Sequence, residues 1–110
     1  MILFFQLLIG HAVADYALQS DWMAKAKNRH HKTTPPPGAT YQACWFWVLS
    51  AHALIHGGAV YVITGSPLLA LIETLVHWCI DFAKCDNWFG INTDQSLHIL
   101  TKALFAIALI

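Results

Sequence analysis

Charged side chains are scarce in this sequence of 110 residues, which has six Lys or Arg and six Asp or Glu. They make up 11% of the chain, whereas ordinary soluble domains carry about 25%. The two signs balance, and without a basic excess the composition argues against a nucleic-acid partner. The 57% of hydrophobic residues excludes a disordered chain. So short a chain cannot bury this apolar surface in its own core, which predicts one integral-membrane domain over residues 1–110.

Cysteine is also sparse. Cys44, Cys79 and Cys85 form no C-x-x-C pair, and their odd number provides no disulfide framework. We therefore expect reduced thiols, as in a protein of the bacterial inner membrane.

Four apolar segments dominate the chain. A helix that crosses the hydrocarbon core needs roughly 20 residues, with a range of about 17–25, and three of the segments lie at the short end of that range. A cleaved signal peptide is the alternative for the first, but it has no basic start and two polar residues interrupt it. The predicted fold is all-α, a four-helix transmembrane bundle with short loops and one polar loop over residues 19–40. The expected helices cover residues 1–18, 41–63, 67–83 and 94–110.

Residues at the ends of these segments are typical of helix caps. Gly65 is expected to end the second helix, and Ser66-Pro67 to begin the third. This connection is so short that the two helices should be antiparallel neighbours. The sequence of residues 92–95, Asn-Thr-Asp-Gln, resembles a capping box at the start of the fourth helix. Gly57-Gly58 should allow close helix packing.

Basic residues predict the orientation in the membrane. Four of the six lie in the first loop and Lys84 lies in the third, whereas the second loop and both termini have none. The positive-inside rule then places loops one and three in the cytoplasm and both termini outside, in a multi-pass protein of the bacterial inner (plasma) membrane. The alternative is that the basic loop recognises nucleic acid or lipid headgroups. Four tryptophans fall near the same interface, as an aromatic belt would: Trp22, Trp45, Trp47 and Trp88.

Acidic residues and histidines recur at one spacing. Nine of them lie in the apolar segments, and each has a partner four residues away. Residues four apart lie on one face of a helix, so each helix has one polar stripe that must face the other helices rather than lipid. The stripes are His11 and Asp15, His52 and His56, Glu73, His77 and Asp81, and Asp94 and His98.

The cost of burying four carboxylates indicates what fills the centre of the bundle. A carboxylate in mid-bilayer costs about 2.5–3.5 kcal/mol, so four cost on the order of 10 kcal/mol. A hydrogen bond between helices returns only about 0.6 kcal/mol, whereas structural zinc contributes apparent values of about 10–16 kcal/mol. We therefore expect one or two divalent metal ions, zinc first, with manganese or iron as alternatives. A metal-free proton or ion relay and purely structural polar contacts remain the other interpretations.

Roles can be assigned to individual polar residues. Glu73 is the candidate general base, or else a ligand that bridges two metals. Gln19 continues the first stripe and Lys102 the fourth, and both are candidate substrate contacts. The alternative for Lys102 is an ion pair with a carboxylate of a stripe. The predicted metal ligands are His11, Asp15, His52, His56, His77, Asp81, Asp94 and His98.

The ordered set of motifs resembles a family of small phage and bacterial integral-membrane proteins whose domain has no known function. The resemblance covers nearly the whole chain, and it implies a compact polytopic membrane protein of viral or bacterial origin but no established activity. A looser likeness is to membrane-bound metal-dependent hydrolases. The motifs are His11-x3-Asp15-x3-Gln19, Asp21-Trp-Met-Ala-Lys25, His52-x3-His56-Gly57, Glu73-x3-His77-x3-Asp81 and Asp94-Gln95-x2-His98.

These features favour a metal-dependent hydrolase that acts on a lipid or a membrane-linked substrate, with its site open to the cytoplasmic leaflet. Membrane lipid is then the expected partner. The first alternative is a metal, ion or proton transporter, which with four short helices would need to form a homo-oligomer. The second is a phage-encoded membrane interaction protein without catalysis, such as a holin-like or exclusion protein, which needs no buried carboxylates.

Overall fold

The computed structural model describes all 110 residues and contains helices but no strand, so the all-α prediction is confirmed. The first predicted helix is an α-helix that continues as a short π-helix, and the polar loop contains one additional short helix. The elements are α1 (Ile2–Ala12), η1 (Val13–Ala17), α2 (Asp21–Ala26), α3 (Trp45–Thr64), α4 (Pro67–Cys85) and α5 (Ile91–Ala108).

The helix ends agree with the prediction from the sequence at the connection between α3 and α4, and they differ from it at the start of α5. Gly65 ends α3 with a φ of 70°, and the Ser66 hydroxyl accepts a hydrogen bond from the Leu69 N–H at 3.2 Å, as expected. The capping box at residues 92–95 is wrong, because α5 begins at Ile91 and has no side-chain cap. The side chain of Gln95 is used elsewhere, since its amide donates to Asp15 and Asp94.

Two features of residues 1–26 were not predicted. Leu18 N–H donates to the Val13 carbonyl at 2.9 Å, which makes the end of the first helix a π-turn that contains Asp15. Such turns are rare and occur often at functional sites. The short helix α2 begins where the Ser20 hydroxyl accepts a hydrogen bond from the Met23 N–H at 3.1 Å.

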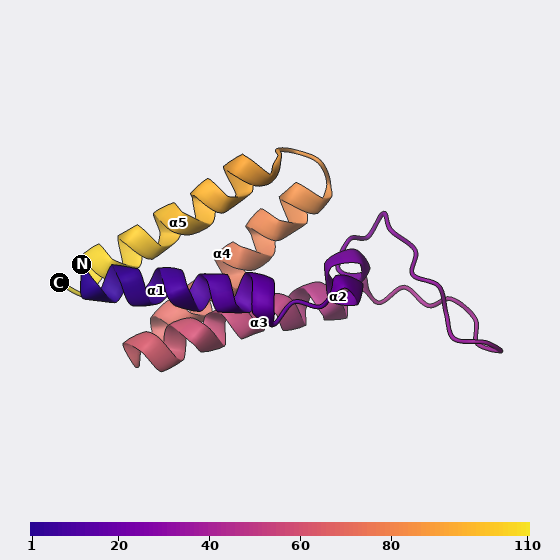
Figure 1. Cartoon of the computed structure of the whole chain (residues 1–110), viewed down its shortest axis with the longest axis horizontal. Coiled ribbons are helices and arrows are strands. Elements are labelled where there is room, and N and C mark those ends of the chain that lie inside the picture. Colours follow the sequence, from indigo (N-terminus) through magenta and orange to yellow (C-terminus); the bar gives the residue numbers. More distant parts are fainter.

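The long helices form an elongated bundle of 54 × 26 × 21 Å (Figure 1). Helices α3 and α4 are antiparallel neighbours, as predicted; α1 packs on α3, α5 packs on α4, and α1 and α5 pack against each other. Both chain termini lie at one end of the bundle, and α2 lies at the other. The connection between α2 and α3 extends away from the bundle in the same direction.

Close packing of α3 on α4 depends on one glycine of the predicted pair. A Cβ added at Gly57 would clash with the Thr74 hydroxyl and lie 2.8 Å from the Ala70 carbonyl oxygen, whereas one added at Gly58 meets nothing within 4 Å. The expectation of close packing is therefore confirmed for Gly57 and wrong for Gly58.

We expect Gly57→Ala to destabilise the fold by about 1–3 kcal/mol, because backbone atoms of α4 cannot move aside as a flexible side chain would. Gly58→Ala is the matched control and should cause no loss, since its methyl group enters open space. Chemical denaturation of the two purified variants would measure the difference. Equal stability of the two would contradict the packing explanation.

The distribution of polarity is inverted relative to a soluble domain. Ten of the 22 buried residues are polar or charged, whereas large apolar side chains are exposed along all the long helices. By length and composition only α3 is long and apolar enough to cross a membrane, and the helix Ile2–Ala17 is apolar but shorter. Helices α4 and α5 are interrupted by charged residues, so four spans are not confirmed.

Candidate metal centre

The four polar stripes meet in one cluster inside the bundle. Contacts between them join α1 and η1 to α3, α3 to α4, and α1 to α5, so each stripe faces the others as predicted. Eight of the nine stripe residues are buried, and Asp15 is partly buried. The cluster lies in the half of the bundle nearer α2, because its members come from the end of the first helix and the beginning of α5.

Five imidazole rings form the middle of the cluster. His77 stacks on His56 with ring centroids 3.6 Å apart and on His98 at 4.2 Å. His52 lies 5.0 Å from His77, and His11 lies 5.1 Å from both His56 and His98. His77 therefore occupies the centre, with a histidine from each of the other three long helices around it.

Four side chains could hold one metal ion. Asp15 Oδ1 lies 3.2 Å from His56 Nε2 and 3.3 Å from His52 Nε2. Together with His77 these residues offer donor atoms that all lie within 4.8 Å of one another. We call this set group A. Three imidazoles and a carboxylate are a ligand set that suits zinc, manganese or iron.

A second set shares His77. Donor atoms of Glu73, His77 and His98 also lie within 4.8 Å of one another, and we call this set group B. Glu73 Oε1 accepts a hydrogen bond from Lys102 Nζ at 2.6 Å, whereas Oε2 has no partner. Both members of this ion pair are only 1% exposed. The ion pair that the sequence left as an alternative for Lys102 is therefore present.

Several donor atoms of the cluster are buried and unpaired. Both ring nitrogens of His52 and of His77 lack a hydrogen-bond partner, as does Glu73 Oε2. A buried polar atom without a partner costs about 1–3 kcal/mol, so the concentration of such atoms in one place needs a compensating ligand. A cation bound between them would satisfy the carboxylate and imidazole lone pairs together.

Three other predicted ligands lie in the cluster but contact protein groups. His11 Nε2 is 3.1 Å from the side-chain oxygen of Gln95. Asp81 Oδ2 accepts a hydrogen bond from Lys27 Nζ at 2.6 Å, and Asp94 accepts one from Gln95 at 3.0 Å. Their ligand roles stay predictions.

Sequence reasoning missed two residues that are central to the site, Lys27 and Gln95. Lys27 was counted only as a topology signal, yet it is buried and paired with Asp81, which is 54 residues away. Gln95 joins His11 of α1 and Asp15 of η1 to α5. Spacing within one helix carries no signal for such contacts between helices.

The cluster opens to the surface at the α2 end. A cavity of about 110 Å³ reaches Asp15, Asp94 and His98 from outside. At the other end of the bundle the core residues Leu7, Val60, Leu69 and Phe105 pack together. The side chains that line the opening, which we call the mouth, include Tyr16, Gln19, Lys27, Asp81, Lys84 and Gln95. Gln19, a predicted substrate contact, is therefore at the mouth, whereas Lys102 is not among these residues.

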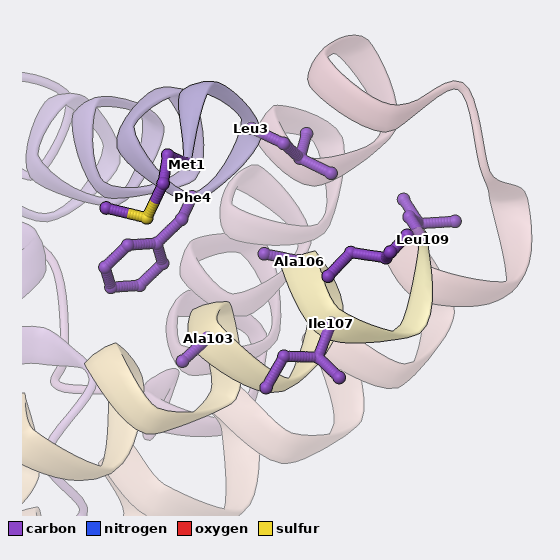
Figure 2. Close-up of a pocket in the computed structure, with 8 residues that line it drawn as sticks. Met1, Leu3, Phe4, Ala103, Ala106, Ile107 and Leu109 are labelled. Carbon is purple, nitrogen blue, oxygen red and sulfur yellow. The ribbon is translucent and has the colours of Figure 1, made fainter.

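A larger pocket of about 300 Å³ lies near the two chain termini, between the start of α1 and the end of α5 (Figure 2). Only hydrophobic residues line it, among them Leu3, Phe4, Ala103 and Ile107. It offers no group for acid–base or metal chemistry, so the polar cluster is the candidate site.

The polar loop is fastened to the end of α4 beside the mouth. Arg29 donates two hydrogen bonds to Asp86, at 2.6 and 3.0 Å, and its guanidinium lies 5.0 Å from the centre of the Phe82 ring. These hydrogen bonds hold the pKa of Asp86 below its ordinary value of 3.8, because they stabilise the ionised carboxylate. His30 Nε2 lies 3.0 Å from the same carboxylate. The loop is therefore fixed up to residue 30.

Comparison with known proteins places the chain in a family. A family model described as "Protein of unknown function (DUF3307)" matches residues 3–110. No curated protein and no solved structure matches the chain.

Proposed function

We propose that this chain, which belongs to the DUF3307 family of proteins of unknown function, is a membrane protein that uses a buried metal centre to hydrolyse a lipid or membrane-linked substrate. The observation that carries this proposal is the pair of buried donor groups that share His77 beneath a polar opening.

The inverted polarity of the bundle supports a membrane environment. Exposed apolar side chains face outward from every long helix, for example Phe5, Leu54, Leu75 and Leu104. Water would make such a surface aggregate, whereas hydrocarbon accommodates it. Trp22, Trp47 and Trp88 are exposed, and we place them at the cytoplasmic interface of a bacterial inner membrane together with the basic loop.

The donor sets support one or two divalent ions, with zinc favoured and manganese or iron as alternatives. Group A would hold one ion and group B another, and His77 could serve both at once only after it loses its ring N–H proton. Groups A and B together contain two carboxylates, Asp15 and Glu73, and the ammonium group of Lys102 compensates only the charge of Glu73. Bound metal would supply the remaining counter-charge.

The arrangement of carboxylates suggests a division of roles for hydrolysis. When bound, the metal lowers the pKa of a water molecule and polarises the bond to be cleaved. Glu73, the base expected from the sequence, is paired with Lys102 and belongs to group B, so we favour it as a ligand. Asp94 belongs to neither group, lines the mouth, and has its Oδ1 atom unpaired. We therefore propose that Asp94 accepts the proton of the attacking water.

One-sided access favours hydrolysis over transport. An ion that entered through the mouth would meet the packed core of Leu7, Val60, Leu69 and Phe105 on the other side of the cluster. Alternating access needs a second opening. A phage-encoded interaction protein needs no buried acidic residues, so the cluster argues against that alternative as well.

Asp94→Asn is the test of the reaction. We expect the variant to retain its metal and to lose at least about 100-fold in turnover, the usual size of a general-base contribution. The assay would use metal-loaded protein in detergent and panels of lipid phosphate and carboxylic esters. Asp21→Asn, which removes an exposed acid of α2, is the control. Metal-loaded wild-type protein that turns over none of these substrates would overturn the proposal of hydrolysis.

A further inference from the structure

We infer that the mouth binds a phosphate group, and that it does so only when the metal centre is occupied. This inference rests on the proposed metal centre and specifies the substrate class that the same site would take. It separates phosphate esters from carboxylic esters, a choice that the donor groups alone leave open.

The first observation is an unpaired cation at the mouth. Lys84, in the last turn of α4, lines the cavity, and its ammonium group has neither an ion pair nor a hydrogen bond. The second lysine there, Lys27, is buried and held by Asp81, so its charge is fixed in position at the cavity wall. Gln19 lines the same opening. Lysine ammonium groups and an amide are suitable partners for phosphate oxygens.

The second observation is the charge balance of the site. Four carboxylates, on Asp15, Glu73, Asp81 and Asp94, face three ammonium groups, on Lys27, Lys84 and Lys102. With neutral histidines the site without metal has a net charge of about −1 and would repel an anion. One divalent ion reverses this to about +1, and two ions give about +2 once the shared His77 has lost its ring proton. A doubly charged phosphate then compensates the excess, which a neutral carboxylic ester cannot do.

The third observation is the size of the cavity. Its volume of about 110 Å³ leaves space for a compact group, since a water molecule in the liquid takes about 30 Å³. A phosphate fits this space. The phosphate could be that of a lipid phosphomonoester or free inorganic phosphate, because both present the same oxygens to the mouth.

The test measures binding of inorganic phosphate to the purified protein in detergent, with and without bound zinc. Calorimetry or thermal stabilisation would detect the binding. We expect binding to the zinc-loaded protein alone. Lys84→Gln should retain its zinc and bind phosphate at least about tenfold more weakly, because one charge-assisted hydrogen bond is lost. Lys25→Gln is the matched control, since Lys25 is an exposed lysine of α2 outside the mouth.

The outcomes separate this inference from the proposed function. A protein that binds no zinc refutes the metal centre itself. The phosphate site is overturned, and the metal centre is left standing, by any of three results. These are no phosphate binding by the zinc-loaded protein, equal binding with and without zinc, and equal binding by the wild type and Lys84→Gln.

Nanodiscs of phosphatidylcholine with added phosphatidic acid or phosphatidylglycerol then identify the source of the phosphate group. Competition with inorganic phosphate by phosphatidic acid alone would indicate a lipid phosphomonoester, and competition by neither would indicate free phosphate.

Discussion

His77→Ala is expected to remove the metal from group B and to weaken its binding to group A. His77 is the one residue that groups A and B share, and its imidazole stacks between those of His56 and His98. Its loss leaves group A with three ligands and group B with two, and group B would then be too small to hold zinc tetrahedrally. Elemental mass spectrometry of protein purified without chelator should find one or two ions in the wild type and fewer in the variant, and a chelator should remove any remaining ion more easily than from the wild type.

A matched substitution of a histidine outside the cluster shows whether metal is lost because a ligand is removed or because any histidine is removed. His31 lies in the polar loop, is exposed, and has no contact with the cluster. His31→Ala should therefore keep the full metal content. His98→Ala removes a ligand of group B only, so it should leave the ion of group A in place. Full metal content in His77→Ala, in folded protein, would show that the cluster does not bind metal as proposed.

Lys102→Met is expected to destabilise the metal-free protein by about 3–5 kcal/mol, the usual cost of removing one partner from a buried ion pair. The reason is that the Glu73 carboxylate, at a position with 1% exposure, would lose the ammonium group 2.6 Å away that balances its charge. Adding Glu73→Gln removes that charge, so the double variant should recover much of the stability. Unfolding in mixed detergent micelles with a chelator present would measure all three proteins.

Two comparisons make this prediction specific. Lys25→Met breaks an exposed ion pair with Asp21 and should cost no more than about 1 kcal/mol. Repeating the Lys102→Met measurement with zinc should reduce the loss, because a metal bound to group B would take over the role of counter-charge to Glu73. A loss that is unchanged by zinc and by Glu73→Gln would mean that packing of the lysine chain, rather than its charge, is what stabilises the bundle.

The sequence was informative wherever the deciding contact lies within one helix or one tight turn. Spacing of four residues placed His52 beside His56 and Glu73 beside His77 on single faces, and burial of those faces brought the four stripes together. Likewise, the left-handed conformation of Gly65 and the hydroxyl cap of Ser66 depend only on their immediate neighbours.

Contacts between distant segments could not be predicted in this way. The pairing of Lys27 with Asp81 and of Arg29 with Asp86 requires the polar loop to fold back on the end of α4, and neither residue carries a local signal for that. The same limit explains the wrong capping box. Gln95 has the residue type that a cap needs, but Asp15 and His11 on the neighbouring helix provide partners for its amide.

The fastening of the polar loop at Arg29 and His30 gives the protein a convenient site for engineering. Beyond these residues the loop extends away from the bundle, and a side chain added at Gly38 would meet nothing within 4 Å. An epitope or affinity tag inserted at Gly38 should therefore leave the helices and the mouth unchanged. Antibody access to such a tag, in intact cells compared with permeabilised cells, would show on which side of a membrane the loop lies, and the same tag would allow purification with both ends of the chain native.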